Sequence, residues 1–259
     1  MIYVIKIGGN IIDNPSSLKD FLRRFAKIQG HKILIHGGGK IATQIADQLQ
    51  IPQQMYHGRR ITDQATLDVV TMVYTGLINK NIVADLHACG CPSLGVCGAD
   101  ANIVLADKRP VKDVDFGFVG DLTDINGEVI HAWLKQDLTP IIAPISHDGN
   151  GQLLNTNADT MASGIAMALS KLEEVKLIYC FEKKGVMMDI EDENSIIQSL
   201  NENDIEKLKV KGLIHSGMLP KLENALYTVK AGVESVIIGH ADDLSLLISG
   251  KSGTKIALT

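Results

Sequence analysis

Two glycine-rich turns within the first forty residues constrain the fold of this chain more than any other feature. Lys6-Ile7-Gly8-Gly9-Asn10 and His36-Gly37-Gly38-Gly39-Lys40 each follow a short apolar run that is typical of a buried parallel strand. Glycine lets backbone amides crowd against an anion, and a helix that starts there presents unpaired, partly positive N–H groups. The turns, with the charge of Lys6, predict a site for a strongly anionic group, most simply a phosphoryl group in transfer.

Apolar strand-like runs alternate with helical patterns along most of the chain. This alternation predicts an α/β fold, a three-layer α-β-α sandwich with a mostly parallel central sheet. A polar segment with Gly58 at its centre, residues 54–62, indicates a hairpin instead of another crossover. The predicted strands are residues 2–7, 32–36, 93–97, 102–106, 117–125, 139–145, 176–181, 235–238 and 255–258.

Helices are predicted from apolar residues at helical spacing and from capping residues at their starts. Ser16 and Ser17 are expected to cap the first long helix, and Thr62 to cap a continuous helix from Asp63 toward Leu86. The other predicted helices are residues 41–49, a helix from the Asn126-Gly127 turn through Trp133, residues 161–170, one from about Met218 and one near Leu244.

Three further predictions concern the organisation of the chain. The cluster 146–151 is rich in turn residues and is expected at the surface, and the charged segment 189–211 is expected to be a solvated insertion around a short helix. A boundary near Leu172 divides the chain into residues 1–172 and 173–259, two lobes that share one continuous sheet.

The composition excludes several classes of function. The chain has 259 residues, 45% of them hydrophobic, which is enough for a large core. Its net charge of −5 argues against nucleic acid as a partner. No apolar run approaches the roughly 20 residues of a membrane span, and no signal-peptide pattern opens the chain, so we expect a cytoplasmic protein. The four cysteines lack the paired spacing of a zinc site, and no protein metal site is expected.

Five motifs in fixed order give the chain a resemblance to the amino acid kinase family. They are Lys6-x-Gly8-Gly9, His36-Gly37-Gly38-Gly39, Gly58-x-Arg60-x-Thr62, Asn155-x-Asn157-Ala158-Asp159 and Gly217-Met218-x-x-Lys221. Within that family they are most similar to the branch that phosphorylates the side-chain carboxylate of N-acetyl-L-glutamate in arginine biosynthesis. The resemblance covers nearly the whole chain.

The resemblance implies a role for each motif residue. Lys6 and Lys221 would approach the phosphoryl group from the two halves of the chain, and Asp159 would hold both ammonium groups. The amides of Gly8, Gly9, Gly38 and Gly39 would line the transfer path, while Arg60 and Asn155 would bind the carboxylates of the acceptor. ATP is the implied phosphoryl donor, and Mg²⁺ would come with it.

Each of these residues, taken alone, also fits a structural role: a solvated lysine, a helix-start carboxylate, a turn asparagine or a surface arginine. A second hypothesis is therefore a nucleotide-binding or metabolite-sensing protein that has the fold without catalysis. Relatives commonly have a Thr/Ser-Asp-Val-x-Gly-Val loop at the nucleotide site, where this chain has Phe181-Glu182-Lys183-Lys184-Gly185-Val186. We expect nucleotide contacts from Glu182 to Gly185, with Lys183 and Lys184 either touching phosphate or solvated.

Arg59, beside the predicted substrate residue Arg60, keeps a second acceptor open. Relatives often have leucine there, and an extra cation favours an extra anion, so N-succinyl-L-glutamate is the alternative to N-acetyl-L-glutamate. Alternation along a strand could also place Arg59 in solvent.

The resemblance also bears on assembly. Arginine-inhibited relatives form hexamers through a helix that precedes the first strand. Because the first strand begins at Ile2, we expect a homodimer that is insensitive to arginine, with its interface around the Asp63 helix and the neighbouring strand.

Overall fold

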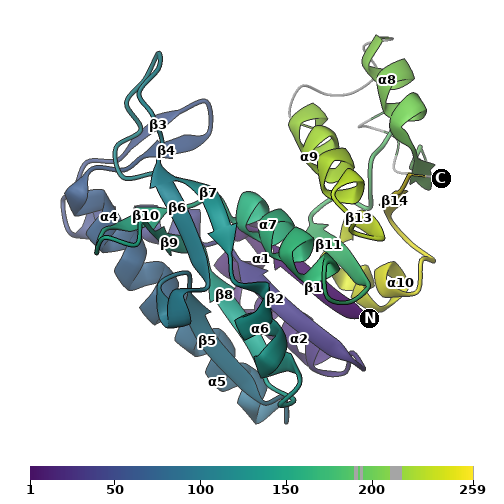
Figure 1. Ribbon diagram of the computed structural model, residues 1–259, viewed down its shortest axis with the longest axis horizontal. Helices are drawn as coiled ribbons and strands as arrows, with labels where there is room; N and C mark the ends of the chain where they lie inside the picture. The colour runs from purple at the N-terminus through teal and green to yellow at the C-terminus, as the bar shows by residue number, and fades with distance from the viewer. Residues whose placement is uncertain (190–191, 193–194, 211–217, 259) are drawn as a thin grey trace.

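The computed structural model describes residues 1–189, 192, 195–210 and 218–258. Within these residues, eight strands form the central sheet, in the order β12-β14-β13-β11-β1-β2-β8-β5 (Figure 1). Neighbouring strands are parallel except for the antiparallel pair β13 and β14. The strands are β1 (Ile2–Ile7), β2 (His31–His36), β5 (Ser93–Cys97), β8 (Thr139–Ala143), β11 (Val175–Phe181), β12 (Ser199–Leu200), β13 (Ser235–His240) and β14 (Thr254–Ile256).

Helices contribute to a separate hydrophobic core on each face of this sheet, which confirms the predicted three-layer fold. In β1, Ile5 and Ile7 pack into one core and Ile2 and Val4 into the other, as strand alternation requires. Lys6 therefore points to the second face. The first core takes residues from α1 (Gly9–Asp13), α2 (Pro15–Ala26), α3 (Gly39–Gln48), α4 (Gln64–Thr71), α5 (Asn79–Ala88) and α10 (Leu244–Ile248), and the second from α6 (Gly127–Leu134), α7 (Ala158–Ser170), α8 (Glu202–Val210) and α9 (Leu219–Lys230).

A smaller sheet and a hairpin stand beside the central sheet (Figure 1). The hairpin pairs β3 (Gln54–Tyr56) with β4 (Arg59–Ile61) around Gly58, whose φ is +74°, and confirms the prediction for residues 54–62. The smaller sheet has the order β10-β9-β6-β7 in the described chain, with β6 (Val104–Lys108), β7 (Gly120–Ile125), β9 (Ile145–His147) and β10 (Leu153–Asn155).

The prediction of one strand over residues 139–145 is wrong, because the chain passes from β8 in the central sheet to β9 in the smaller one at Pro144. Proline has no N–H for a sheet ladder. The surface prediction for residues 146–151 is also partly wrong, since Ser146 belongs to β9 and is fully buried. Three other predicted strands, residues 102–106, 117–125 and 255–258, are shifted or shortened to β6, β7 and β14.

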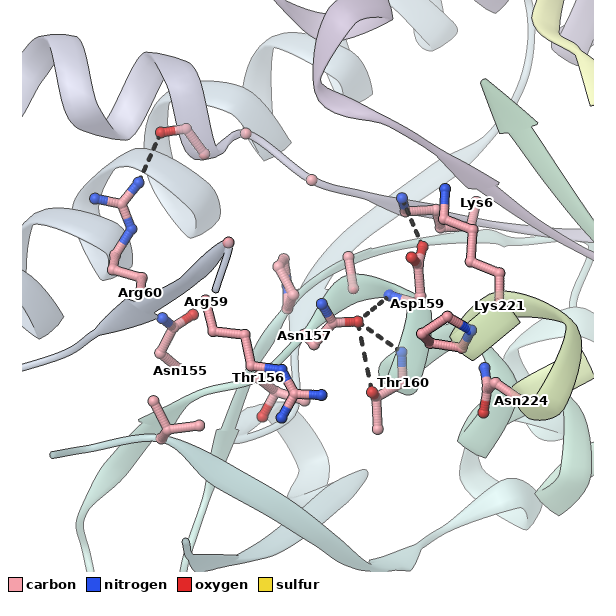
Figure 2. Close-up of a pocket in the computed structure, with 18 of the residues that line it drawn as sticks. Lys6, Arg59, Arg60, Asn155, Thr156, Asn157, Asp159, Thr160, Lys221 and Asn224 are labelled. Atoms are coloured by element: carbon pink, nitrogen blue, oxygen red, sulfur yellow. Dashed lines mark hydrogen bonds and ion pairs between the residues drawn. The ribbon is translucent and has the colours of Figure 1, made fainter. Parts of the chain in front are cut away.

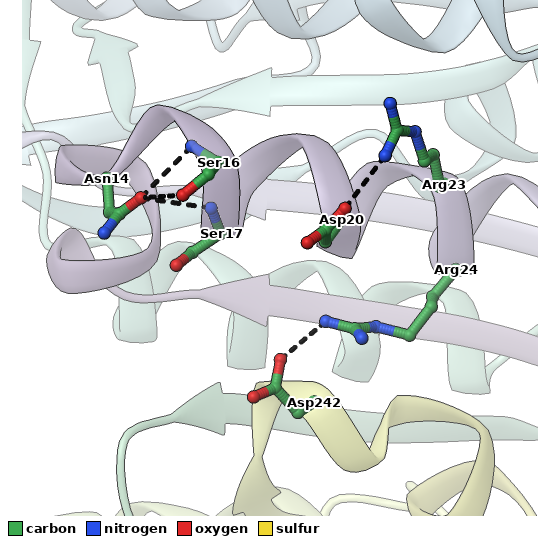
Figure 3. Close-up of polar contacts among 7 residues, drawn as sticks. All are labelled: Asn14, Ser16, Ser17, Asp20, Arg23, Arg24 and Asp242. Atoms are coloured by element: carbon green, nitrogen blue, oxygen red, sulfur yellow. Dashed lines mark hydrogen bonds and ion pairs between the residues drawn. The ribbon is translucent and has the colours of Figure 1, made fainter.

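Two helix caps differ from the predicted ones. The Asn14 side chain, not Ser16 or Ser17, caps α2, because its Oδ1 accepts from both serine amides at 3.1 Å (Figure 3). Asp63 instead of Thr62 caps α4, where its carboxylate accepts from the Thr66 amide at 2.8 Å. The carboxylate and amide oxygens compete well with hydroxyl groups for this position.

The helix predicted from Asp63 toward Leu86 runs to Ala88, but a π-helix, Met72–Ile78, separates α4 from α5. Such bulges occur often at functional sites. Here the π-helix packs against the triple-glycine turn: a Cβ built on Gly38 would lie 2.2 Å from the Ile78 Cδ1 atom.

The central sheet contains strands from both sides of Leu172. The segment expected as a solvated insertion holds β12 and α8, which bury Leu200 and Ile205, while residues 190–191, 193–194 and 211 lie outside the described residues. No helix among the described residues is long and apolar enough to cross a membrane. An ion pair of 2.5 Å between Arg24 and Asp242 joins α2 to the segment after β13 (Figure 3).

Candidate active site

A cavity of about 510 Å³ opens where the carboxyl ends of β1, β2 and β11 meet the N-terminus of α7. Ligands of open parallel sheets bind at this edge, where the strands end and the helices begin. Figure 2 shows Lys6, Asp159 and Lys221 on one side of the cavity and Arg60 and Asn155 on the other. Seven of the predicted site residues line it: Lys6, Gly38, Gly39, Arg60, Asn155, Asp159 and Lys221.

The two glycine turns lie next to each other at this edge. The Gly37 amide donates to the Ile7 carbonyl at 3.3 Å, and a Cβ on Gly37 would lie 3.9 Å from the Gly9 nitrogen. Gly38 has φ +147° and faces the π-helix without room for a side chain. The backbone amides that precede α1 and α3 are therefore brought together, as an anion site requires.

Lys6 and Asp159 form an ion pair of 2.6 Å inside the cavity (Figure 2). Asp159 lies in the first turn of α7, where the Asn157 side chain accepts from its amide at 2.9 Å and from the Thr160 amide at 3.1 Å. The side chains of Lys6 and Asp159 are only 15% and 28% exposed, and the helix N-terminus favours the negative charge of the carboxylate. The ammonium group of Lys6 is thus fixed at the end of β1.

Lys221 enters the cavity from the first turn of α9, directly after Pro220. Its ammonium nitrogen lies 4.7 Å from the centroid of the Phe181 ring. Among the described residues no ion pair joins Lys221 to Asp159, so a shared anchor for both lysines stays a prediction. Gly217, which opens this motif, lies outside the described residues.

Arg60 is buried and joins the hairpin to the triple-glycine turn. Its guanidinium donates to the Gly39 carbonyl and to the Thr43 hydroxyl, both at 2.9 Å, and to the Gln53 side chain. Figure 2 shows this group turned away from Asp159. Contact between Arg60 and a substrate carboxylate stays a prediction.

Asn155 is the last residue of β10 and lies beside Thr62, the residue that follows β4 of the hairpin. Its side-chain nitrogen donates to the hydroxyl of the fully buried Thr62 at 3.0 Å. This bond fixes the Asn155 amide group at the cavity wall, while its role as a substrate ligand stays a prediction.

Two further arginines, Arg59 and Arg109, line the cavity. Figure 2 shows the Arg59 side chain extending toward Thr156 and Thr160, so this exposed residue does not point away from the site. Arg109 forms an ion pair of 2.6 Å with Asp121. Sequence reasoning missed Arg109, because it lies in no motif and reaches the cavity only through the folding of the loop after β6.

The other predicted site residues do not line the cavity. Gly8 and Gly9 are not among the lining residues, but a Cβ on Gly8 would be only 4.0 Å from the ammonium nitrogen of Lys6, which lines the cavity. The loop 182–185 follows β11 and is fixed to β14, since the Val186 amide donates to the Thr254 hydroxyl at 2.8 Å. Nucleotide contacts by Glu182, Lys183, Lys184 and Gly185 therefore stay predictions.

His36 supports the triple-glycine turn from inside the protein. Its Nδ1 bonds to the Gly37 carbonyl at 2.9 Å and its Nε2 to the Asn79 side-chain nitrogen at 3.1 Å. A carbonyl only accepts, so Nδ1 carries the proton and Nε2 accepts. Complete burial lowers the pKa of His36 to about 4. The imidazole is thus a neutral structural group.

Residues 1–240 match the amino acid kinase family. A protein of Cytophaga hutchinsonii named acetylglutamate kinase is 53% identical over 258 aligned residues, with 98% of each chain covered. A protein of Phocaeicola vulgatus with the same name is 49% identical over 253 residues, which are 98% of this chain and 97% of that one.

Solved structures show the same fold. The protein smu.665 of Streptococcus mutans has a TM-score of 0.77 and 30% identity, with 100% of this chain and 99% of that chain covered. Carbamate kinase from Giardia lamblia bound to AMP-PNP has a TM-score of 0.74 at 17% identity, with 100% and 98% covered, and shows a likeness of fold alone.

Proposed function

This chain belongs to the amino acid kinase family, and from that premise we propose that it transfers the terminal phosphoryl group of ATP to the side-chain carboxylate of N-acetyl-L-glutamate, in arginine biosynthesis. Relatives named acetylglutamate kinase, matched along nearly the whole chain, support the choice of acceptor. The observation that carries the proposal is the Lys6–Asp159 ion pair in a cavity that Lys221 enters from the other half of the chain.

The proposed reaction needs charge stabilisation more than a general base. A glutamate carboxylate has a pKa near 4.3 in water and is already ionised at neutral pH. The barrier arises from bringing two anionic groups together, so lysines and backbone amides are the useful groups. Lys6 and Lys221 neutralise the charge of the transferred group, and Asp159 holds the Lys6 ammonium group in place. The amides of Gly8, Gly9, Gly38 and Gly39 line the path.

The substrate sites divide between the two proposed lobes. Arg60 and Asn155, in residues 1–172, bind the carboxylates of the acceptor, and the loop 182–185, in residues 173–259, binds the nucleotide. The cationic and amide-lined part of the cavity suits phosphate groups. No group of three or more His, Cys, Asp or Glu side chains among the described residues could hold a metal ion. Mg²⁺ would come with ATP, held mainly by phosphate oxygens and water, and it would neutralise phosphate charge.

Trapping the acyl phosphate with hydroxylamine tests this function. Wild-type protein with ATP, Mg²⁺ and N-acetyl-L-glutamate should form a hydroxamate, and Lys6→Met should lower kcat by about 10² to 10³. The control is Lys19→Met, because Lys19 is an exposed lysine of α2 that does not line the cavity. Absence of hydroxamate with every carboxylate acceptor tried would favour the metabolite-sensing alternative.

A second acceptor, N-succinyl-L-glutamate, is favoured by one specific observation. Arg59 and Arg109 both line the cavity, and a succinyl group offers one more carboxylate than an acetyl group. If Arg59 binds it, Arg59→Leu should reduce kcat/KM for the succinyl substrate alone, by roughly tenfold or more. Arg23→Leu, at an exposed arginine of α2, is the matched control. Equal losses for both substrates would exclude this role of Arg59.

We also propose a cytoplasmic homodimer. Met72 and Leu77, on the π-helix, are 55% and 47% exposed, and β5 lies at the edge of the central sheet. A second copy packed there would cover this apolar surface. Sedimentation velocity should give a dimer for the wild type and a monomer for Leu77→Glu; a wild-type monomer would refute the proposal.

A further inference from the structure

The Lys221 ammonium group has an aromatic partner in the cavity. Its nitrogen lies 4.7 Å from the centroid of the Phe181 ring, and both residues line the cavity wall. The face of an aromatic ring carries negative potential, so it attracts a cation, and more strongly where water is displaced. The ring therefore holds the ammonium group without cancelling its charge.

The carboxylate of the site is engaged elsewhere. Asp159 pairs with Lys6 at 2.6 Å, and among the residues that the structure describes no carboxylate forms an ion pair with Lys221. A carboxylate at this position would neutralise much of the charge that the proposed transfer needs. An aromatic partner leaves the full positive charge available for phosphate oxygens.

The register between β11 and α9 places the ring under the lysine. Tyr179 and Phe181 are two residues apart on β11 and share the face that supports α9. Lys221 and Asn224 are three apart on α9 and share one side of the helix. The Asn224 side chain donates to the Tyr179 hydroxyl at 3.1 Å, and that hydroxyl donates to the Asp159 carbonyl at 3.1 Å.

The Tyr179 hydroxyl stays protonated, because burial, reinforced by the charge of Asp159, raises its pKa. It can therefore keep donating to the Asp159 carbonyl. The start of α9 is thus attached to β11 at two adjacent points, one polar and one cationic.

We propose that Phe181 is a positioning residue that holds the Lys221 ammonium group at the transfer path through its aromatic face. This inference rests on the proposed function, in which Lys221 acts on the transferred phosphoryl group. Phe181 itself takes no part in bond making.

The contact between Lys221 and Phe181 can be tested by a measurement that does not depend on catalysis. In protein containing ¹³C-labelled lysine, the Phe181 ring current should shift the ε-methylene signal of Lys221, which is assigned by its loss in Lys221→Arg. Phe181→Tyr should keep the shift and Phe181→Leu should abolish it. A Lys221 signal that is the same in wild type and Phe181→Leu would overturn the proposal.

Kinetics then test the positioning role. Phe181→Leu should lower kcat between about twofold and thirtyfold with the KM for N-acetyl-L-glutamate unchanged, and Phe181→Tyr should stay near the wild type. Phe118→Leu is the matched control, because it removes a similar contact outside the cavity. The Lys108 ammonium nitrogen lies 5.0 Å from the centroid of the Phe118 ring, and neither residue lines the cavity. An altered KM for N-acetyl-L-glutamate with an unchanged kcat in Phe181→Leu would contradict positioning of Lys221.

The double variant separates this role from a structural one. If Phe181 acts through Lys221, then Phe181→Leu should cause no further loss of kcat in a Lys221→Ala background. An equal loss in both backgrounds would overturn the proposal. Wild-type protein that forms no hydroxamate would refute the proposed function instead, and the lysine signal would still decide whether the contact exists.

Discussion

Gly38→Ala adds a single methyl group and is expected to damage both stability and catalysis. At φ +147° the backbone of Gly38 lies in a region that L-residues rarely adopt, which costs about 1–3 kcal/mol. The new Cβ would lie 2.2 Å from Ile78 Cδ1 and 3.3 Å from the Tyr74 ring, so the first contact must open by more than about 1 Å. Such overpacking costs about 1–3 kcal/mol. We expect the free energy of unfolding to fall by about 2–6 kcal/mol.

The same displacement should lower kcat, because the amides of the turn line the cavity. A shift of about 1 Å costs about 100-fold in rate. Urea denaturation measures the stability and hydroxamate formation measures kcat. Adding Ile78→Ala removes the clash and leaves the backbone strain, so the double variant should recover only part of the lost activity.

Gly76→Ala is the control for this experiment, since a Cβ at Gly76 meets no atom within 4 Å. That substitution should leave kcat unchanged and raise stability by up to about 1 kcal/mol. A Gly38→Ala protein as stable and as active as the wild type would refute the reasoning from the glycine geometry.

The remaining predictions concern charge. Lys221→Ala should lower kcat far more than it raises KM, because the charge acts chiefly in the transition state, and a wild-type kcat would remove Lys221 from the mechanism. Burial lowers the pKa of His36 to about 4, so the unfolded chain binds a proton below pH 6.5 and the folded chain does not. The free energy of unfolding should therefore fall by about 3 kcal/mol for this group as the pH drops from 6.5 to 4. Urea titrations at several pH values should show a shallower fall for the His36→Asn variant. Hydrogen bonds from His131 and Lys135 lower the pKa of Glu173 to about 2. Glu173 should stabilise the fold above pH 4.5 and lose this effect as the pH falls toward 2, so the melting temperature of Glu173→Gln should depend less on pH there.

Elements with a strong hydrophobic period could be predicted from the sequence. The apolar run of β1 and the helical spacing of Phe21, Leu22 and Phe25 in α2 report directly on burial. The Gly58 hairpin followed from its turn residue and polar strands. These features are local, so a single stretch of chain contains the information.

Features that depend on competition or on distant segments were missed. Thr62 and Asp63 are both acceptable caps, and only the folded geometry shows that the Asp63 carboxylate reaches the Thr66 amide. The π-helix does not alter the apolar pattern enough to be recognised. In the candidate site, the ordered motifs predicted Lys6, Asp159 and Lys221. Arg109 belongs to no motif and lines the cavity only because of the tertiary fold.

The position of β1 within the sheet determines which parts of the site can move. Each residue of β1 from Ile2 to Ile7 is in register with β2 on one side and β11 on the other. Lys6 cannot be displaced along the strand without breaking both ladders, while Lys221 stands on a helix and Arg60 on a two-stranded hairpin. The Lys6 ammonium group is therefore held in a fixed position. Any closure around the proposed substrates would bring α9 and the hairpin toward it. Amide hydrogen exchange in β1 should then be slow with or without substrates, and the change on binding should be confined to those outer elements.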